Sequence, residues 1–261
     1  MKHRHFSISL MGIVLAAVAI TARADEEKEQ KSEKNVSPEA LKILEQSVEA
    51  VKKVNFARYN AEFTSTAWIR TRIPDVKGKA AIGKMSKYDV PRFRCDVELT
   101  PPAKPDAEEK PKTQRLTAGS DGDNYYLIDS EEKIVYVDMD PAVLGSNGGG
   151  IQRLLMRVLV DKEPFADELK ADTIEKRDDA KVGSVPCYNI YVKSDEGEAN
   201  WFISKSDLLP RRVERFYKNR EDEVGTIDLT ISNLEYSSKL DLEPFRVTVP
   251  DGFKKTDDFA P

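Results

Sequence analysis

The side chains that could carry out chemistry are few and widely spaced. Only two histidines, His3 and His5, and two cysteines, Cys95 and Cys187, occur among the 261 residues. Both histidines lie in an N-terminal stretch that we expect to be removed. The remaining chain then has no base for a Ser-His or Cys-His nucleophile and no histidine metal ligand. Two thiolates are too few for a zinc site, so we expect no catalytic residue, no metal and no cofactor.

Carboxylates are the one abundant reactive group. A pair of carboxylates can hydrolyse a glycosidic bond without histidine when the two groups face each other about 5 to 10 Å apart in a cleft. The chain has 46 acidic residues and therefore many accidental pairs, and no particular pair stands out. A histidine-free hydrolase is kept as the third hypothesis.

The two cysteines allow a disulfide if the protein is exported to an oxidising compartment. A Cys95–Cys187 bond would close a loop of 92 residues, which the chain-entropy model values at about 4.5 kcal/mol. The alternative is two separate buried thiols that act as small apolar side chains. The sequence leaves both alternatives open.

The first 24 residues have the features of an export signal. Lys2 and Arg4 are followed by an apolar run of 13 residues from Ile8 to Ile20 and by Ala22-Arg23-Ala24, which fits an A-x-A cleavage site. A membrane-spanning helix needs about 20 apolar residues. We predict a signal peptide at 1–24, a soluble exported protein, and a flexible charged leader at 25–36 with too few apolar groups to fold.

Charge excludes one class of partner. Without residues 1–24 the chain carries 38 basic and 46 acidic residues, and no basic block rises above this background. Proteins that bind nucleic acids show a clustered basic surface. We therefore expect no nucleic acid as a partner.

Apolar spacing predicts one helix near the start and strands after it. Ser37 is a suitable N-cap before Pro38, and an apolar stripe then indicates a helix to about Lys53. From Tyr59 to Ile73 the apolar positions alternate, which indicates one long strand. In the stretch NWFISKSDLLPRRVERFYK (200–218) two strands flank a turn, and Val213, Arg215 and Tyr217 share one face of the second strand.

Most of the remaining chain also alternates with a period of two. We predict further strands at Val76–Met85, Phe93–Leu99, 114–120, 124–128, 133–138, Thr173–Arg177, Cys187–Lys193, Asn200–Ser204, Arg211–Tyr217, Thr226–Tyr236 and Phe245–Val249. A second helix is expected at 151–160, after the glycine-rich hinge SNGGG (146–150), and an exposed proline-rich loop at 100–113. No strand-helix-strand alternation runs through the chain, so the sheet should be mainly antiparallel.

These elements predict a mainly β (α+β) fold in one domain, residues 37–261. A sheet of this size must curl or split, and two apolar helix faces are available to cover it. We expect an incompletely closed antiparallel β-barrel of about 11–12 strands, with helices over the open side. Such a barrel can leave a ligand cavity or fill it with its own side chains.

Several stretches resemble the LolA/LolB-like superfamily of periplasmic lipoprotein carriers. They are SKSDLLPRRVERFY (204–217), TIDLTISNLEYSSKLDLEPFRVTVPDGFK (226–254), SKYDVPRFRCDVEL (86–99) and AGSDGDNYYLIDSEEKIVYV (118–137). The resemblance covers most of the chain after the predicted signal peptide, and its motifs are short. It implies a periplasmic protein that binds acyl chains of lipoproteins or related apolar ligands and does no covalent chemistry. The partners would be a lipid or lipidated protein and an envelope membrane complex; the oligomeric state is left open.

The resemblance also implies where a ligand would bind. The family's carriers have a functional basic residue before a proline, for which Lys87 is the nearest match and Arg92 lies just past Pro91. Candidate ligand contacts are the apolar residues of the predicted strands and second helix: Phe63, Ile69, Phe93, Val97, Leu154, Leu155 and Val158. Each of these could equally be ordinary core, and Trp68 and Trp201 fit packed aromatics.

Two main hypotheses follow. In the first, the protein is a lipoprotein carrier or envelope sensor that holds an acyl chain inside an apolar barrel. In the second, the barrel is filled and the protein is an envelope scaffold that binds a partner through its proline-rich loop. An empty, apolar interior would favour the first.

Overall fold

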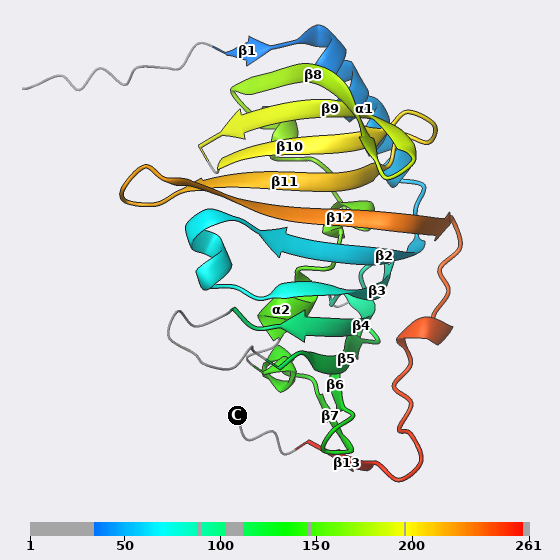
Figure 1. Cartoon of the computed structure of the whole chain (residues 1–261). Helices are drawn as coiled ribbons and strands as arrows, with labels where there is room; N and C mark the ends of the chain where they lie inside the picture. The colour runs from blue at the N-terminus through cyan, green and yellow to red at the C-terminus, as the bar shows by residue number, and fades with distance from the viewer. Residues whose placement is uncertain (1–33, 88–89, 103–111, 146–147, 196, 258–261) are drawn as a thin grey trace, which may run out of the picture. The chain divides into compact units, whose positions relative to one another are not determined.

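Strands account for most of the structure (Figure 1). The computed structural model describes residues 34–87, 90–102, 112–145, 148–195 and 197–257. The predicted signal peptide, residues 25–33 of the predicted leader and residues 103–111 of the proline-rich loop lie outside the described residues.

The strands of the described ranges form one sheet of thirteen, in the order β1-β8-β9-β10-β11-β12-β2-β3-β4-β5-β6-β7-β13. Their bounds are β1 Asn35–Val36, β2 Phe56–Ser65, β3 Asp75–Gly83, β4 Arg92–Thr100, β5 Gln114–Ser120, β6 Tyr125–Asp129, β7 Ile134–Asp138, β8 Thr173–Val182, β9 Val185–Ser194, β10 Gly197–Ser204, β11 Pro210–Lys218, β12 Val224–Ser237 and β13 Lys254–Thr256.

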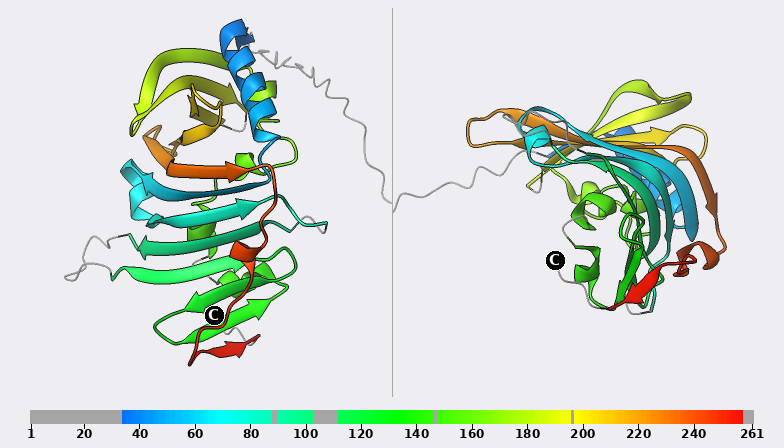
Figure 2. Two further views of the ribbon diagram at one scale, coloured as in Figure 1. Left: turned by 90° about the vertical axis from the view of Figure 1, so that its right-hand side faces the viewer. Right: turned by 60° about the horizontal axis from the view of Figure 1, so that its bottom comes forward.

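The sheet is curved and does not close on itself. The neighbouring pairs from β8 to β7 are antiparallel, whereas the outermost strands β1 and β13 each pair in parallel with their neighbour. The right-hand view of Figure 2 shows the strands bending round the helical connection between β7 and β8. The predicted fold class, a mainly β, incompletely closed and mostly antiparallel barrel with helices on its open side, is confirmed.

One predicted strand is absent, and two observed strands were not predicted. Eleven of the twelve predicted strands are present, but Phe245–Val249 is not a strand in the structure. The two short edge strands, β1 and β13, were not predicted. Asn35–Val36 belongs to the predicted flexible leader, yet its backbone pairs with Thr173 and Ile174 of β8.

The concave face of the sheet carries the main core. Along β4, Phe93, Cys95, Val97 and Leu99 are buried in one cluster, while the residues between them are polar. The same alternation in β2 buries Tyr59, Ala61 and Phe63 on this face. Because side chains alternate along a strand, the sequence period places one apolar face inward.

Helix α1, Pro38–Val51, covers the concave face at the β8 end of the sheet (Figures 1 and 2). The Ser37 hydroxyl caps the helix by accepting a hydrogen bond from the Ala40 N–H at 3.4 Å, as predicted from its position before Pro38. Leu44 and Val51 on the inward side of the helix are fully buried. The predicted helix ended at about Lys53, two residues beyond the observed end.

The second helix, predicted over 151–160, is not continuous. Residues 148–170, which we call the strap, comprise the short helix α2 (Gly148–Gln152) and the 3₁₀ turns η3 (Arg157–Leu159) and η4 (Glu168–Lys170). Gly148–Gly150 of the predicted hinge begin α2.

Tyr59 stabilises the break in the strap. Its hydroxyl, in the core, accepts a hydrogen bond from the Met156 N–H at 2.8 Å and donates one to the Leu154 carbonyl at 3.2 Å. These are the backbone groups that an interrupted helix leaves without internal partners. Burial strongly raises the pKa of the Tyr59 phenol, with the Met156 contact opposing the shift, so the hydroxyl stays neutral.

The long strand predicted from Tyr59 to Ile73 ends early. The strand β2 stops at Ser65, Ala67 takes a φ of 50°, and the 3₁₀ helix η1 covers Ala67–Thr71. Ile69 then packs where a Cβ on Gly225 would stand, 2.8 Å from such an atom. The absent side chain at Gly225 therefore makes room for the turn.

The chain after β12 crosses the convex face. Its 3₁₀ turn η5 (Glu243–Phe245) buries Phe245 against Phe56, with ring centroids 5.9 Å apart. Further on, Val247 and Phe253 cover a small apolar cluster of β6 and β7 that contains Tyr126. The residues predicted as a last strand thus cover outward-facing apolar side chains.

The described residues contain no helix long and apolar enough to cross a membrane. The remaining 3₁₀ turn, η2 (Pro141–Leu144), is capped by the side chain of Asp140, the residue before it.

Candidate ligand-binding site

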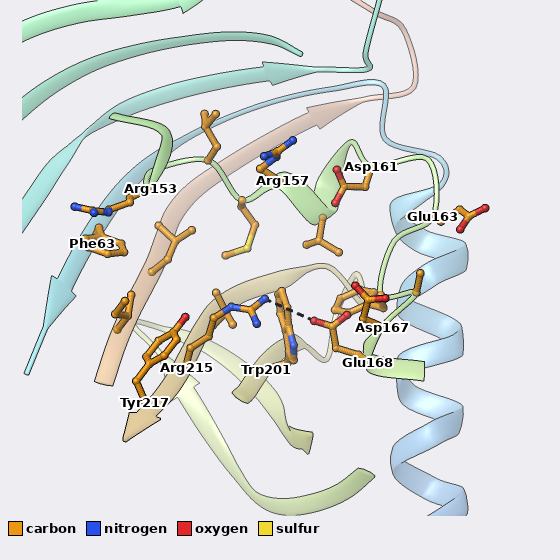
Figure 3. A pocket seen from close by; sticks show the side chains of 18 residues that line it. Phe63, Arg153, Arg157, Asp161, Glu163, Asp167, Glu168, Trp201, Arg215 and Tyr217 are labelled. Carbon is orange, nitrogen blue, oxygen red and sulfur yellow. Dashed lines mark ion pairs between the residues drawn. The ribbon is translucent and has the colours of Figure 1, made fainter. Parts of the chain in front are cut away.

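A pocket of about 430 Å³ lies between the strap and strands β2, β10, β11 and β12 (Figure 3). We call it the concave pocket. Its apolar lining consists of Phe63, Leu155, Met156, Val158, Phe165, Ala166, Trp201, Val213, Ile227 and Leu229, with Tyr217 beside them. Its charged lining consists of Arg153, Arg157, Arg215, Asp161, Glu163, Asp167 and Glu168.

An aromatic pair forms part of the apolar lining. Trp201 of β10 and Phe165 of the strap meet edge to face, with ring centroids 4.9 Å apart. The Arg215 guanidinium lies 5.7 Å from the centre of the Trp201 ring, within the range of a cation–π contact. Arg215 also forms an ion pair with Glu168 at 3.7 Å, so the strap is tied to the sheet by both apolar and charged contacts.

Burial raises the pKa values of two acids in this pocket. It raises the pKa of Glu168, and the nearby Arg215 charge only partly opposes the rise. Burial likewise raises the pKa of Asp161, against the charges of Arg157 and Lys84. The indole N–H of Trp201 is directed toward the Glu168 carboxylate but forms no hydrogen bond of good geometry within the described residues.

The charged groups are separated along the pocket. In Figure 3 the four acids gather on the side of α1, and Arg153 lies with Phe63 on the opposite side. The Arg153 guanidinium is 5.4 Å from the centre of the Phe63 ring. Burial lowers the pKa of Arg153, which indicates that the charge is partly withdrawn from water.

A second pocket of about 260 Å³ adjoins the first. Leu155, Arg157 and Asp161 of the strap line both. Its remaining walls come from β3, the β3–β4 connection, the start of β4, β6, η2 and two further residues of the strap: Ile82, Met85, Pro91, Arg92, Phe93, Tyr125, Pro141, Gln152 and Val160. The strap therefore has a hollow on each side.

The structure brings some of the predicted contact residues together and separates others. Phe63, Leu155 and Val158 line the concave pocket, and Phe93 lines the second pocket together with Leu155. The remaining three are buried without lining either pocket: Val97 and Leu154 lie in the main core, and Ile69 packs beside Gly225.

The two basic residues suggested by the family motif have different surroundings. Arg92 lines the second pocket and donates a hydrogen bond to the Lys84 carbonyl at 2.8 Å. Lys87 is exposed and lines neither of these pockets.

The two cysteines are not linked. Both thiols are free and fully buried. Cys95 lies on β4 in the main core, and Cys187 lies on β9 in a separate cluster with Val182 and Phe202. Five strands stand between β4 and β9 in the sheet, so the alternative of two separate thiols describes the structure. No group of three or more His, Cys, Asp or Glu residues in the described ranges could hold a metal ion.

Several lining residues were not predicted as site residues. The alternation of β11 placed Val213, Arg215 and Tyr217 on one face, but the sequence gives no sign that this face meets Phe63. Trp201 was interpreted only as a packed aromatic. The strap residues Phe165 and Glu168 follow no periodic pattern, so nothing in the sequence pointed to them.

Comparison with solved structures identifies the fold. LprF from Mycobacterium bovis matches with a TM-score of 0.50 and 12% identity, over 83% of this chain and 98% of that one. The Mycobacterium tuberculosis lipoprotein LppX matches with a TM-score of 0.41 and 15% identity, over 79% and 99% of the two chains. A LolA superfamily protein from Nitrosomonas europaea matches with a TM-score of 0.24 and 8% identity, over 80% and 97%.

The match to LprF shows a shared fold, in agreement with the LolA-like fold expected from the sequence resemblance. At such identities the likeness concerns the fold alone. No protein-family model and no curated protein sequence matches the chain.

Proposed function

We propose that this protein is an exported, non-catalytic binding protein that holds an acyl chain, a lipid or a lipidated protein in the concave pocket, as a carrier or envelope sensor. The observation that supports this most directly is the apolar lining of a hollow of about 430 Å³. Ligand sites in proteins commonly have volumes of about 300 to 1,000 Å³ and largely apolar walls with a few polar groups.

Apolar burial would drive binding. Each methylene group moved from water into an apolar site contributes about 0.8 kcal/mol. Phe63, Val213 and Leu229 come from three different strands and face the same hollow. A flexible chain could therefore contact several strands at once.

The acids of the pocket also bear on the hydrolase hypothesis. Glu168 forms an ion pair with Arg215 of β11, so its carboxylate is already engaged by the sheet. With no histidine after residue 24, general acid–base catalysis would have to use carboxylates or other titratable side chains. Binding without chemistry is the simpler use of this pocket.

Native mass spectrometry of protein purified from its own cell envelope would test the proposal. We expect a bound lipid to co-purify. Leu229→Trp adds bulk on the pocket side of β12, and Thr230→Trp is the matched control because the neighbouring side chain faces the convex side. Lipid should be reduced in the first variant and retained in the second. Equal lipid content in two folded variants, or no lipid in the native protein, would contradict the proposal.

One part of the concave face is filled by side chains, and this favours the second candidate function, an envelope scaffold. Beside α1 the concave face is occupied by the protein's own side chains, including Leu44, Val48 and Ile190. In this alternative the proline-rich loop binds a partner. Deleting residues 101–111 would then abolish capture of an envelope protein without changing lipid content.

A further inference from the structure

The separation of charges in the concave pocket gives its two sides different chemistry. The acids occupy the side of α1, and the apolar lining continues from Trp201 toward Phe63 (Figure 3). Beyond Phe63 stands Arg153, at the opposite side from the acids. Arg153 is therefore the cation on the side of the pocket away from the acids.

Arg153 differs from the other two arginines of the pocket. Arg215 is paired with Glu168, and Arg157 is exposed to solvent. Arg153 is half-buried and lines the pocket. Its side chain forms no ion pair and no hydrogen bond with the described residues. Its guanidinium makes a cation–π contact with the Phe63 ring. A guanidinium keeps its charge in proteins and offers five N–H donors.

A half-buried cation without an acid partner is costly in the empty protein. Removing a charge from water is unfavourable unless a partner compensates it, and the stacking on Phe63 compensates only in part because it leaves the N–H donors unused. An anion that enters the pocket would supply the missing acceptors. Arginine is well suited to this because its planar fork matches a carboxylate or phosphate.

We propose that Arg153 is an anchor for the anionic head of an acyl ligand, so that the concave pocket selects amphiphiles with a carboxylate or phosphate group over neutral ones. This inference rests on the proposed function, since it assigns the orientation of the ligand in the same pocket. The acyl chain extends from Arg153 across Phe63 toward Val213 and Leu229. On the other side of the pocket the four acids outnumber Arg157 and Arg215, which disfavours the reverse orientation of an anionic head group.

The experiment compares ligands that differ only in charge. Hexadecanoic acid, hexadecyl phosphate and methyl hexadecanoate are titrated into the delipidated full-length protein at neutral pH, with binding followed by displacement of a fluorescent fatty acid. Hydrogen bonds to a charged group correspond to roughly ten- to hundredfold in affinity. We expect both anionic ligands to bind at least tenfold more tightly than the ester. Sodium acetate and inorganic phosphate should bind far more weakly, because the acyl chain supplies most of the affinity.

Variants of Arg153 test the residue itself. Arg153→Met keeps an unbranched side chain over Phe63 and removes the charge, and should abolish the preference for the anions while leaving ester binding unchanged. Arg153→Lys should restore part of the preference. Arg70→Met, at an exposed position of η1 outside the pocket, is the control and should behave as the native protein. Melting temperatures confirm that each variant is folded.

The outcomes separate this inference from the function on which it rests. If the native protein binds the acids and the ester equally, or if Arg153→Met keeps the full preference, the anchor is refuted while lipid binding stands. If none of the three acyl ligands binds, the proposed function fails and the anchor with it. If acetate or phosphate alone binds as tightly as the acids, the site recognises a free anion and the acyl orientation is wrong.

Discussion

Replacing Tyr59 by phenylalanine tests whether one buried hydroxyl holds the strap in its interrupted form. The side chain is almost fully buried, with 3% of its surface exposed, and its hydroxyl bridges the Met156 N–H and the Leu154 carbonyl. Phenylalanine preserves the ring and leaves both backbone groups without a partner. A buried polar group left unsatisfied costs about 1–3 kcal/mol. At about 1–2 kcal/mol for each of the two groups, the lower half of that range, we expect a loss of about 2 to 4 kcal/mol of unfolding free energy.

Equilibrium unfolding in urea would measure the loss. With a slope of about 2–3 kcal/mol/M for a domain of this kind, the midpoint should fall by about 1 M while the slope stays the same. The control is Tyr236→Phe, because Tyr236 is 50% exposed and such surface changes usually stay within about 0.5 kcal/mol. Hydrogen exchange should also show faster exchange of the Met156 amide in Tyr59→Phe.

A loss below about 0.5 kcal/mol, with unchanged exchange at Met156, would refute the reasoning. It would mean that water or a different backbone arrangement satisfies the two groups. A lower midpoint with a changed slope would instead indicate altered compactness of the native or unfolded state.

Three further predictions concern other sites. Gly78→Ala should destabilise the protein by about 1–3 kcal/mol or more, because a Cβ there would stand 2.1 Å from the Asp96 carbonyl oxygen; a change within 0.5 kcal/mol in chemical unfolding would contradict the close approach of β3 and β4. Burial raises the pKa of Glu168 above 4.5, so the stability contributed by its protonated form is present below pH 4.5 and lost as the pH rises through the raised pKa. The melting temperature of Glu168→Gln, relative to that of the native protein, should therefore increase as the pH rises from 4.5 to 7. The matching gain in unfolding free energy is about 1.4 kcal/mol for each unit by which the pKa of Glu168 is raised. A difference in melting temperature that does not depend on pH would contradict this. Cys95 is fully buried and burial raises the pKa of its thiol, so an aromatic disulfide reagent should label it only in denaturant; rapid labelling of the native protein would show that β4 opens readily.

The strands were predictable because their burial follows the local pattern. Residues 114–120 were predicted as a strand and form β5 with the same bounds, since alternation and the flanking turns agree there. The helix beginning at Pro38 was equally clear, because a cap, a proline and an apolar stripe gave the same answer. Where several local signals agree, tertiary packing has little reason to override them.

The break in the strap could not be predicted because the apolar residues of 151–160 are not confined to one helical face. Met156 and Val160 are buried as well as Leu154 and Val158, so the pattern does not distinguish a helix from a buried irregular segment. Its conformation depends on Tyr59, which lies almost a hundred residues away in the sequence. For the same reason the concave pocket was predicted only through Phe63, Leu155 and Val158, whereas the contribution of β10 and β11 required knowledge of the sheet order.

The two parallel strands at the margins of the sheet have a consequence for the protein's behaviour in solution. β1 and β13 occupy the outer edges of β8 and β7 with only two and three residues each. An uncovered edge offers backbone donors and acceptors to any other chain, and short strands are one way in which proteins limit such association. Shortening the polypeptide at either margin, by proteolysis or by cloning, would expose the edge of β8 or β7 to intermolecular pairing and so favour aggregation.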